Sequence, residues 1–226
     1  MLHLLFAYPS STMIIHPESH LERVGEYLRD LRVLEVGCGD GFRSKQLVGF
    51  CRELVGIDPN AAAVAEACAR HGDERIEYLV ATAESLPFPA ASFGSVVFVL
   101  SLHHIPVHQM ASAIDEAIRV AVPDAPIIFI EPGFRGLFFE MDEKIGVCDG
   151  DERLQKAQAY AAILSHPGLQ EVEEFWDTTR YSFTSTTDFA EEFELSPCQF
   201  AAADAFLTVV EHELDGERRI NVCRKR

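Results

Sequence analysis

The sequence predicts an α/β fold, in which a doubly wound, mostly parallel sheet is covered by helices on both faces. Two observations favour this class. Short apolar runs alternate with helical patterns at intervals of roughly 20–30 residues, which is typical of parallel strands joined by crossover helices. The runs are also rich in Val, Ile and Leu with little polar alternation, as expected for strands that are buried on both faces.

The individual elements follow from local patterns. Leu21, Val24 and Leu28 recur at helical spacing, and an alanine-rich stretch ends just before Gly72, the usual position of a glycine past a helix. We therefore expect helices at 18–30, 42–51, 61–70 and 108–121, between strands at 32–36, 53–57, 76–80, 95–100 and 126–130. Beyond Glu131 the pattern is weaker. There the expected helices lie near 151–165, 186–194 and 197–213, with strands at 179–183 and 219–223.

Composition and charge exclude several classes of protein. The chain has 226 residues, 48% hydrophobic and 24% charged, which is the composition of one globular domain and not of a disordered segment. Its apolar runs, such as 96–100 and 125–130, are too short to span a bilayer. A net charge of −17 repels phosphate backbones, which argues against a nucleic-acid partner.

The negative charge is concentrated in one stretch. Residues 140–194 carry 14 acids and 4 bases, against 17 and 10 in residues 1–139 and 5 and 5 in residues 195–226. Two interpretations stay open for this stretch: a solvated helical face, or a lid that favours a cationic or neutral substrate.

Cysteine usage indicates the compartment. The six cysteines are far apart and form no CxxC pair, which argues against a zinc site or a secreted disulfide framework and favours a reducing environment. Residues 1–8 are apolar but lack the basic start, long apolar core and cleavage site of a signal peptide. We expect a cytoplasmic protein.

The most informative stretch is the turn GCGDG at 37–41, between a strand and a helix. Glycines permit positive φ and close approach of a ligand to the backbone, and the following helix offers free N–H groups. Asp58 ends the next strand, where a carboxylate can accept both hydroxyls of a ribose. A tight turn without a ligand would account for the glycines by themselves, but not for their combination with a strand, a helix and an acid at the end of the next strand. We therefore favour a nucleoside-bearing cofactor.

Spacing and charge narrow the choice of cofactor. The dinucleotide fingerprint GxGxxG needs a third glycine where this chain has Phe42. A pyrophosphate on the turn would be repelled by Glu35 and Asp40, whereas a cationic sulfonium with an amino-acid tail would not. Both points disfavour NAD, and an NAD-dependent oxidoreductase is only a remote alternative.

Several motifs, in order, resemble those of class I S-adenosylmethionine-dependent methyltransferases. They are VLEVGCGDG at 33–41, VGIDPN at 55–60, AESLPFPAASF at 83–93 and VVFVLSLHHI at 96–105. The resemblance is greatest to the small-molecule branch that includes ubiquinone and menaquinone biosynthesis methyltransferases, and it covers residues 30–131 well. It implies a seven-stranded Rossmann-like sheet with a helical insertion after the fifth strand.

The resemblance also implies S-adenosylmethionine as cofactor and assigns its contacts. Asp58 would bind the ribose diol, and the carbonyl of Leu100 would lie near the methionine amine. Two positions depart from the family, which often has Asp where this chain has Thr82 and Gly94; the first puts one adenine contact in doubt. The expected cofactor-binding residues are Glu35, Gly37, Cys38, Gly39, Gly41, Asp58, Pro59, Ala83, Glu84 and Leu100.

The sequence thus predicts a methyltransferase that transfers a methyl group from S-adenosylmethionine to a small-molecule acceptor by in-line substitution. We expect a single domain over 1–226, with an N-terminal helical lid at 1–30, a cofactor-binding core at 31–131, and acceptor-side helices and final strands at 132–226. The alternative is a non-catalytic, cofactor-binding regulatory or scaffold domain. The acceptor and the oligomeric state, monomer or dimer, are left open.

The favoured interpretation of the histidines is a packing or hydrogen-bonding role, a proton-accepting or substrate-facing role is the alternative, and a metal site is disfavoured. His103 and His104 are adjacent on an extended segment and so point to opposite sides, and with His108 they have no acid or cysteine at ligand spacing. No metal is therefore expected. His104 is the candidate catalytic proton acceptor, because the end of the fourth strand opens onto the predicted cleft.

Aromatic residues of the second half can line an acceptor pocket or pack in the core. Burial in the core is the favoured interpretation for Trp176 and for Phe134, Phe138 and Phe139. Arg180 and Tyr181 lie in the variable segment that contributes to the acceptor pocket in the resembled family.

Overall fold

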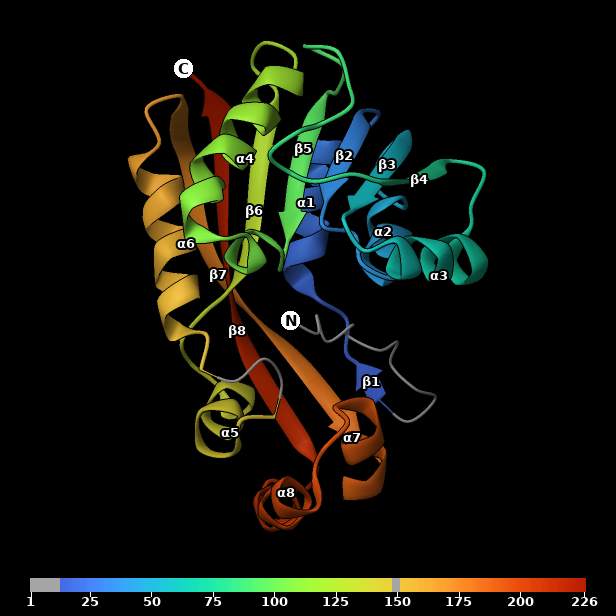
Figure 1. Ribbon diagram of the computed structural model, residues 1–226, viewed down its shortest axis with the longest axis vertical. Helices are drawn as coiled ribbons and strands as arrows, with labels where there is room; N and C mark the ends of the chain where they lie inside the picture. The colour runs from blue at the N-terminus through green and yellow to red at the C-terminus, as the bar shows by residue number, and fades with distance from the viewer. Residues whose placement is uncertain (1–12, 148–150) are drawn as a thin grey trace.

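The computed structural model describes residues 13–147 and 151–226, which form one mixed β-sheet with helices on both faces (Figure 1). The elements are β1 (Met13–Ile15), α1 (Ser19–Leu28), β2 (Arg32–Val36), α2 (Phe42–Leu47), β3 (Glu53–Asp58), α3 (Ala61–His71), β4 (Ile76–Val80), β5 (Ser95–Val99), the 3-10 helix η1 (Leu102–His104), α4 (Val107–Val120), β6 (Pro126–Pro132), α5 (Leu137–Ile145), α6 (Arg153–Ser165), β7 (Leu169–Phe183), α7 (Thr186–Glu192), α8 (Pro197–Val209) and β8 (Glu213–Lys225).

The sheet confirms the predicted fold class and adds a strand to it. Its order is β1-β7-β8-β6-β5-β2-β3-β4. The five strands from β6 to β4 are parallel, whereas β8, β7 and β1 pair in antiparallel fashion. The short edge strand β1 was not expected from the sequence.

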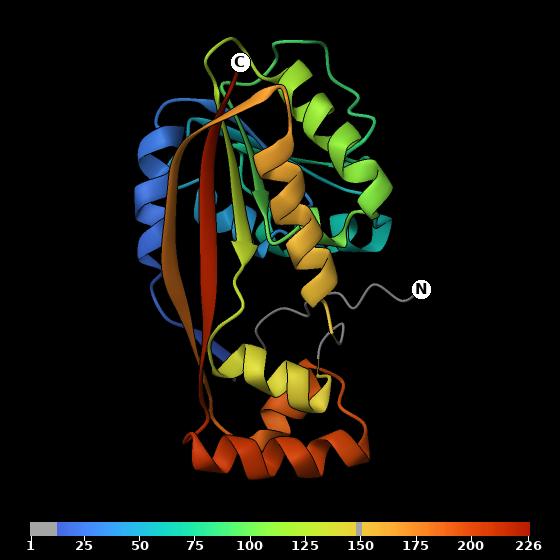
Figure 2. The ribbon, with the colours of Figure 1, turned by 90° about the vertical axis from the view of Figure 1, so that its left-hand side faces the viewer.

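Helices cover the sheet on both faces, with α1 on one side and α4 and α6 on the other (Figure 2). Along β5, Val97 packs with α1 in one hydrophobic cluster, and Phe98 packs with α4 and α6 in another. Phe98 stacks on Phe129 of β6 with ring centroids 5.0 Å apart. Because successive side chains enter opposite cores, the strand has no polar face, which explains its uninterrupted apolar sequence.

A second packing unit lies beyond the carboxyl ends of the parallel strands. Pairing between β6 and β8 ends at Arg218, and residues 213–217 of β8 pair only with β7. This extension of the hairpin, with β1, α5, α7 and α8, forms what we call the lower lobe (Figures 1 and 2). Its own core is built around Met141, Phe189 and Leu207.

One buried carboxylate joins the start of α1 to both units. Glu18 accepts hydrogen bonds from the Arg43 guanidinium of α2 and from Thr179 Oγ1 of β7, the latter at 2.5 Å. Burial acts to raise the pKa of Glu18, but the charge of Arg43 and these bonds hold it below the usual value. Residues 19–28 of the segment predicted as a lid therefore form a layer fixed to the sheet, whereas residues 1–12 lie outside the described part of the chain.

Most expected elements are present, with shifted ends. The strand expected at 179–183 is only the end of β7, in which the exposed or half-buried Glu171, Glu173 and Glu174 make the sequence look too polar for a strand. The helix expected to reach residue 213 ends at Val209, because the chain turns through positive φ at Glu211 and His212. The local pattern predicted no helix at the position of α5, although the resemblance implied a helical insertion after the fifth expected strand. Among the described residues, no helix has both the length and the apolar character needed to cross a lipid bilayer.

Candidate functional site

The glycine turn after β2 is folded against the end of β3. The amides of Gly37 and Cys38 both donate to the carbonyl of Ile57, at 2.8 and 2.9 Å. Gly37, Gly39 and Gly41 all have positive φ, of 80°, 54° and 86°. Such angles are readily adopted only by glycine, which explains why glycine occupies these three positions of the turn.

The three glycines differ in what surrounds them. A Cβ at Gly37 would lie 2.5 Å from Ser101 Cβ, and one at Gly41 would lie 2.6 Å from the Tyr78 hydroxyl. A Cβ at Gly39 would have no protein atom within 4 Å. Gly37 and Gly41 are thus required by packing, whereas Gly39 presents bare backbone to open space that a ligand can enter.

Asp58 lies directly beside this open backbone. Its Oδ2 accepts the Gly39 N–H at 3.0 Å, and its Oδ1 accepts the Asn60 N–H at 2.8 Å. Asn60 in turn caps α3 by accepting the Ala62 N–H at 3.0 Å. Each carboxylate oxygen has a further lone pair, so Asp58 can accept two more hydrogen bonds from a diol.

These residues line a cleft of about 420 Å³ between the carboxyl edge of the sheet and the lower lobe. Leu100, just past β5, has a positive φ of 52° and donates its N–H to the Ile130 carbonyl at 2.7 Å. Backbone in this region is strained for a leucine and is a frequent feature of functional sites. The predicted residues that line the cleft are Gly37, Cys38, Gly39, Asp58, Pro59, Ala83, Glu84, Leu100 and His104.

Glu35 and Gly41, also predicted to bind the cofactor, are not among the lining residues. Glu35 is completely buried beneath the turn, where its Oε2 accepts the Ser44 hydroxyl at 2.5 Å and its Oε1 has no partner. Burial raises the pKa of Glu35 to about 8. The structure therefore gives Glu35 a place under the turn that supports it, with no direct contact to the cleft.

A buried histidine–carboxylate pair lies at the end of β5 and β6, and the sequence analysis missed it. His103 Nδ1 is 2.5 Å from Glu131 Oε2, and Glu131 Oε1 accepts the Leu102 N–H at 3.0 Å. Burial acts to raise the pKa of Glu131, but His103 and these bonds hold it below its usual value. A signal was present: Glu131 is the one acid at the end of the apolar run IIFI.

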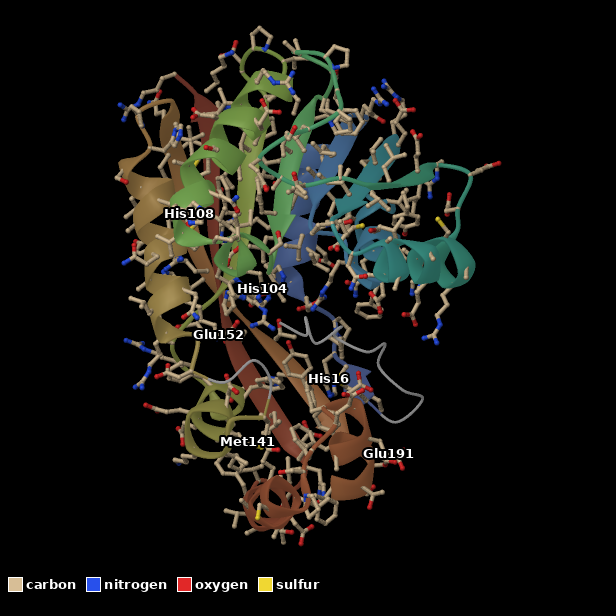
Figure 3. All side chains as sticks on the ribbon, in the orientation of Figure 1. His16, His104, His108, Met141, Glu152 and Glu191 are labelled. Carbon is tan, nitrogen blue, oxygen red and sulfur yellow. The ribbon has the colours of Figure 1, made fainter. Side chains whose placement is uncertain are left out.

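Glu152 brings a carboxylate to the histidines from the start of α6 (Figure 3). His103, His104 and Glu152 each offer one ligand atom within 4.8 Å of the others, so the expectation that no acid lies near the pair is wrong. Lys156 Nζ is, however, 3.2 Å from Glu152 Oε2. This ammonium group neutralises Glu152 and would repel a metal ion there. His108 lies apart on α4.

The lower lobe contributes aromatic side chains to the cleft. Phe138 contacts the rings of Tyr181 and Phe193, with centroids 5.4 and 5.6 Å away, and Phe139 completes this wall. Phe134 and Arg180 do not line it. The core interpretation of Trp176 is wrong: its side chain is 48% exposed, on the outer face of the sheet over Arg219.

Comparison with known proteins finds similarity to methyltransferases. Residues 34–129 match a family described as a methyltransferase domain. The 27-O-demethylrifamycin SV methyltransferase of Amycolatopsis mediterranei is 31% identical over 173 residues, 72% of this chain and 62% of that protein. The ubiquinone/menaquinone biosynthesis C-methyltransferase of Methylobacterium nodulans is 31% identical over 109 residues, 46% of this chain and 42% of that protein. The chain spans less than two thirds of either relative's length.

A solved structure shows the same fold with a bound ligand. The N-methyltransferase NodS of Bradyrhizobium japonicum, in complex with S-adenosyl-L-homocysteine, is 20% identical with a TM-score of 0.52. The match covers 89% of this chain and 84% of NodS.

Because the Glu35 carboxyl is buried and only one of its oxygens has a partner, we expect the free energy of unfolding to depend on pH. A pKa raised to about 8 in the folded state means that the stability contributed by protonated Glu35 is complete below its unfolded pKa and is lost as the pH rises through 8. Because the Glu35→Gln variant cannot ionise, its free energy of unfolding should rise relative to that of wild type by about 4 kcal/mol between about pH 5 and pH 9. Urea unfolding at both pH values measures this, with exposed Glu74→Gln as control. A constant difference between variant and wild type would contradict it.

Proposed function

We propose that the protein transfers a methyl group from S-adenosylmethionine to a small-molecule acceptor, since residues 34–129 match a family described as a methyltransferase domain. One observation carries the proposal. The Asp58 carboxylate lies 3.0 Å from the amide nitrogen of Gly39, and a Cβ at Gly39 would have no protein atom within 4 Å, so a ribose diol and the adjoining part of the cofactor have room beside a carboxylate that can bind them.

The residues of the chain act mainly by orientation. When bound, S-adenosylmethionine supplies a methyl group on a sulfonium, which is displaced in line by the acceptor. Asp58 would hold the ribose hydroxyls, and the Leu100 carbonyl would accept a hydrogen bond from the methionine amine. Ala83 and Glu84 would flank the adenine. Aligning the acceptor with the methyl group can by itself provide much of the acceleration.

For an acceptor that loses a proton, two histidines are available. Glu131 accepts the Nδ1–H of His103, which leaves Nε2 as the ring atom able to take a proton. This support favours His103 as the proton acceptor, with Glu131 as its positioning residue. His104, the residue predicted from the sequence, is closer to Glu152, at 3.5 Å between Nδ1 and Oε1, and is the alternative.

The other predicted functions gain less support. Asp40, within the glycine turn, and Asp58, beside it, line the cleft and would repel a pyrophosphate, which disfavours NAD. A non-catalytic domain would not need the His103–Glu131 pair. The five cysteines within the described residues are free, in keeping with the expected cytoplasmic location.

Removing the Asp58 carboxylate should weaken cofactor binding. We expect Asp58→Ala to reduce the affinity for S-adenosylhomocysteine by roughly 1–3 kcal/mol, the effect of leaving ligand hydroxyls unpaired in a buried site. Isothermal titration calorimetry measures it, with the exposed acid Glu74→Ala as the matched control. An unchanged affinity would place the ribose elsewhere.

The glycines of the turn should separate binding from stability. Gly39→Ala introduces a methyl group into the open cleft, so it should reduce S-adenosylhomocysteine affinity at least about tenfold. Its cost in the fold is the strain of positive φ without a clash, so it should lower the melting temperature less than Gly37→Ala does. Gly37→Ala meets Ser101 and should lower the melting temperature markedly. Calorimetry and thermal unfolding of both variants provide the test. The reverse pattern would show that the cofactor does not lie over Gly39.

Turnover tests the proposed activity itself. Incubation with S-adenosylmethionine and a library of hydroxylated and amino acceptors should release S-adenosylhomocysteine, detected by mass spectrometry. With a hydroxyl acceptor, His103→Gln should lower kcat by about 100-fold or more, the usual contribution of a general base. The exposed His108→Gln is the control, and His104→Gln compares the alternative. Binding of S-adenosylhomocysteine without turnover of any acceptor would favour the non-catalytic function.

A further inference from the structure

Arg218 is a buried cation on the wall of the cleft without a counter-ion. Arg218 is 7% exposed. It belongs to β8 and lines the cleft where the sheet joins the lower lobe. Nη2 donates to the Tyr181 hydroxyl, and Nη1 donates to the Glu217 carbonyl at 3.1 Å. Nε has no hydrogen-bond partner. Among residues 13–147 and 151–226, the guanidinium thus contacts only neutral oxygens.

Three carboxylates, from the neighbouring strand and from the cleft, are directed to other groups. Asp177 is the cross-strand neighbour of Arg218 in the β7–β8 pairing, a position from which opposite charges normally pair. Its Oδ2 instead accepts bonds from the Ser19 hydroxyl and from the backbone and ring nitrogens of His20, at 2.8–2.9 Å. In the cleft, Glu152 is paired with Lys156, and Glu217 Oε2 accepts the Phe134 N–H.

An unpaired charge in such a place is costly to the fold. Buried charges are normally paired, because removing them from water without compensation is strongly unfavourable. A guanidinium is also the side chain that best fits a carboxylate or phosphate, through parallel N–H donors. The arrangement is therefore that of an anion site whose negative partner comes from a ligand.

The position of Arg218 relative to the methyl-transfer site sets the size of that ligand. Arg218 pairs with Pro132 on β6, and Leu100 bonds to Ile130 on the same strand. Leu100 and Arg218 are therefore separated by two strand spacings, about 10 Å. The rings of Phe138 and Tyr181 lie in the same cleft. This distance suits a small molecule with an apolar or aromatic body.

We propose that the methyl acceptor carries an anionic group, such as a carboxylate, that binds Arg218 while its body lies against the aromatic wall. The inference rests on the proposed function, since it names the class of acceptor for that site. Arg218 thus favours an anionic acceptor over the cationic one that a lid formed by the acidic 140–194 stretch would favour.

Paired ligands test the site by equilibrium binding, independently of turnover. Hydroxylated aromatic carboxylates of increasing length, each with its uncharged primary amide, are titrated into the protein alone and into protein saturated with S-adenosylhomocysteine. For at least one length, the acid should bind about 10- to 100-fold more tightly than the amide, as expected for a charge-assisted hydrogen bond. Equal or absent binding of acids and amides at every length overturns the proposal.

Variants assign the preference to Arg218. Arg218→Gln should abolish the acid-over-amide preference, and Arg218→Lys should retain only part of it, because lysine offers a single point charge. Arg224→Gln, at the far end of β8, should leave the preference intact. A preference that persists in folded Arg218→Gln, or in full in Arg218→Lys, contradicts the proposal. If S-adenosylhomocysteine does not bind but the protein still prefers acids to amides, the result contradicts the proposed cofactor chemistry and leaves the anion site at Arg218 supported.

Discussion

The site depends on one carbonyl group, that of Ile57, which accepts hydrogen bonds from two successive amides of the glycine turn. These bonds continue the parallel pairing of β2 and β3, in which Val36 lies opposite Ile57. They hold the turn against the end of β3, where Asp58, the residue after Ile57, accepts a hydrogen bond from the amide of Gly39. The ligand-facing backbone and its carboxylate are thus placed by the register of the sheet, with no adjustment needed from flexible side chains.

The cleft has two walls of different chemistry. The wall on the parallel sheet offers backbone groups, Asp58 and the buried His103–Glu131 pair, and all of these come from the carboxyl ends of strands. The opposite wall is made by the extension of the β7–β8 hairpin and by α5, and it offers rings together with Arg218. In the function proposed above, the first wall would bind the methyl donor and the second would select the acceptor. This division matches the extent of the family match, which ends at residue 129.

The sequence predicted the first wall better than the second for physical reasons. Strands buried on both faces and a turn that requires glycines leave strong local patterns, so residues 31–131 could be interpreted almost element by element. The long strand β7 has one solvated face and resembles a polar loop in sequence. The pairing of His103 with Glu131 and the approach of Glu152 depend on how separate strands and helices meet, which no local pattern records. Arg218 lies in a charged run in which nothing distinguishes a buried guanidinium from an exposed one.

Glu18 has a mechanical consequence. It is bonded to Arg43, on the helix that begins at the glycine turn, and to Thr179, two residues before Tyr181 on the opposite wall. Elements of both walls are therefore hydrogen-bonded to the same carboxylate. A movement that widens the gap between the two walls has to stretch or break these hydrogen bonds. Glu18 therefore opposes the opening of the cleft through which ligands would enter and leave, although it does not line the cleft itself.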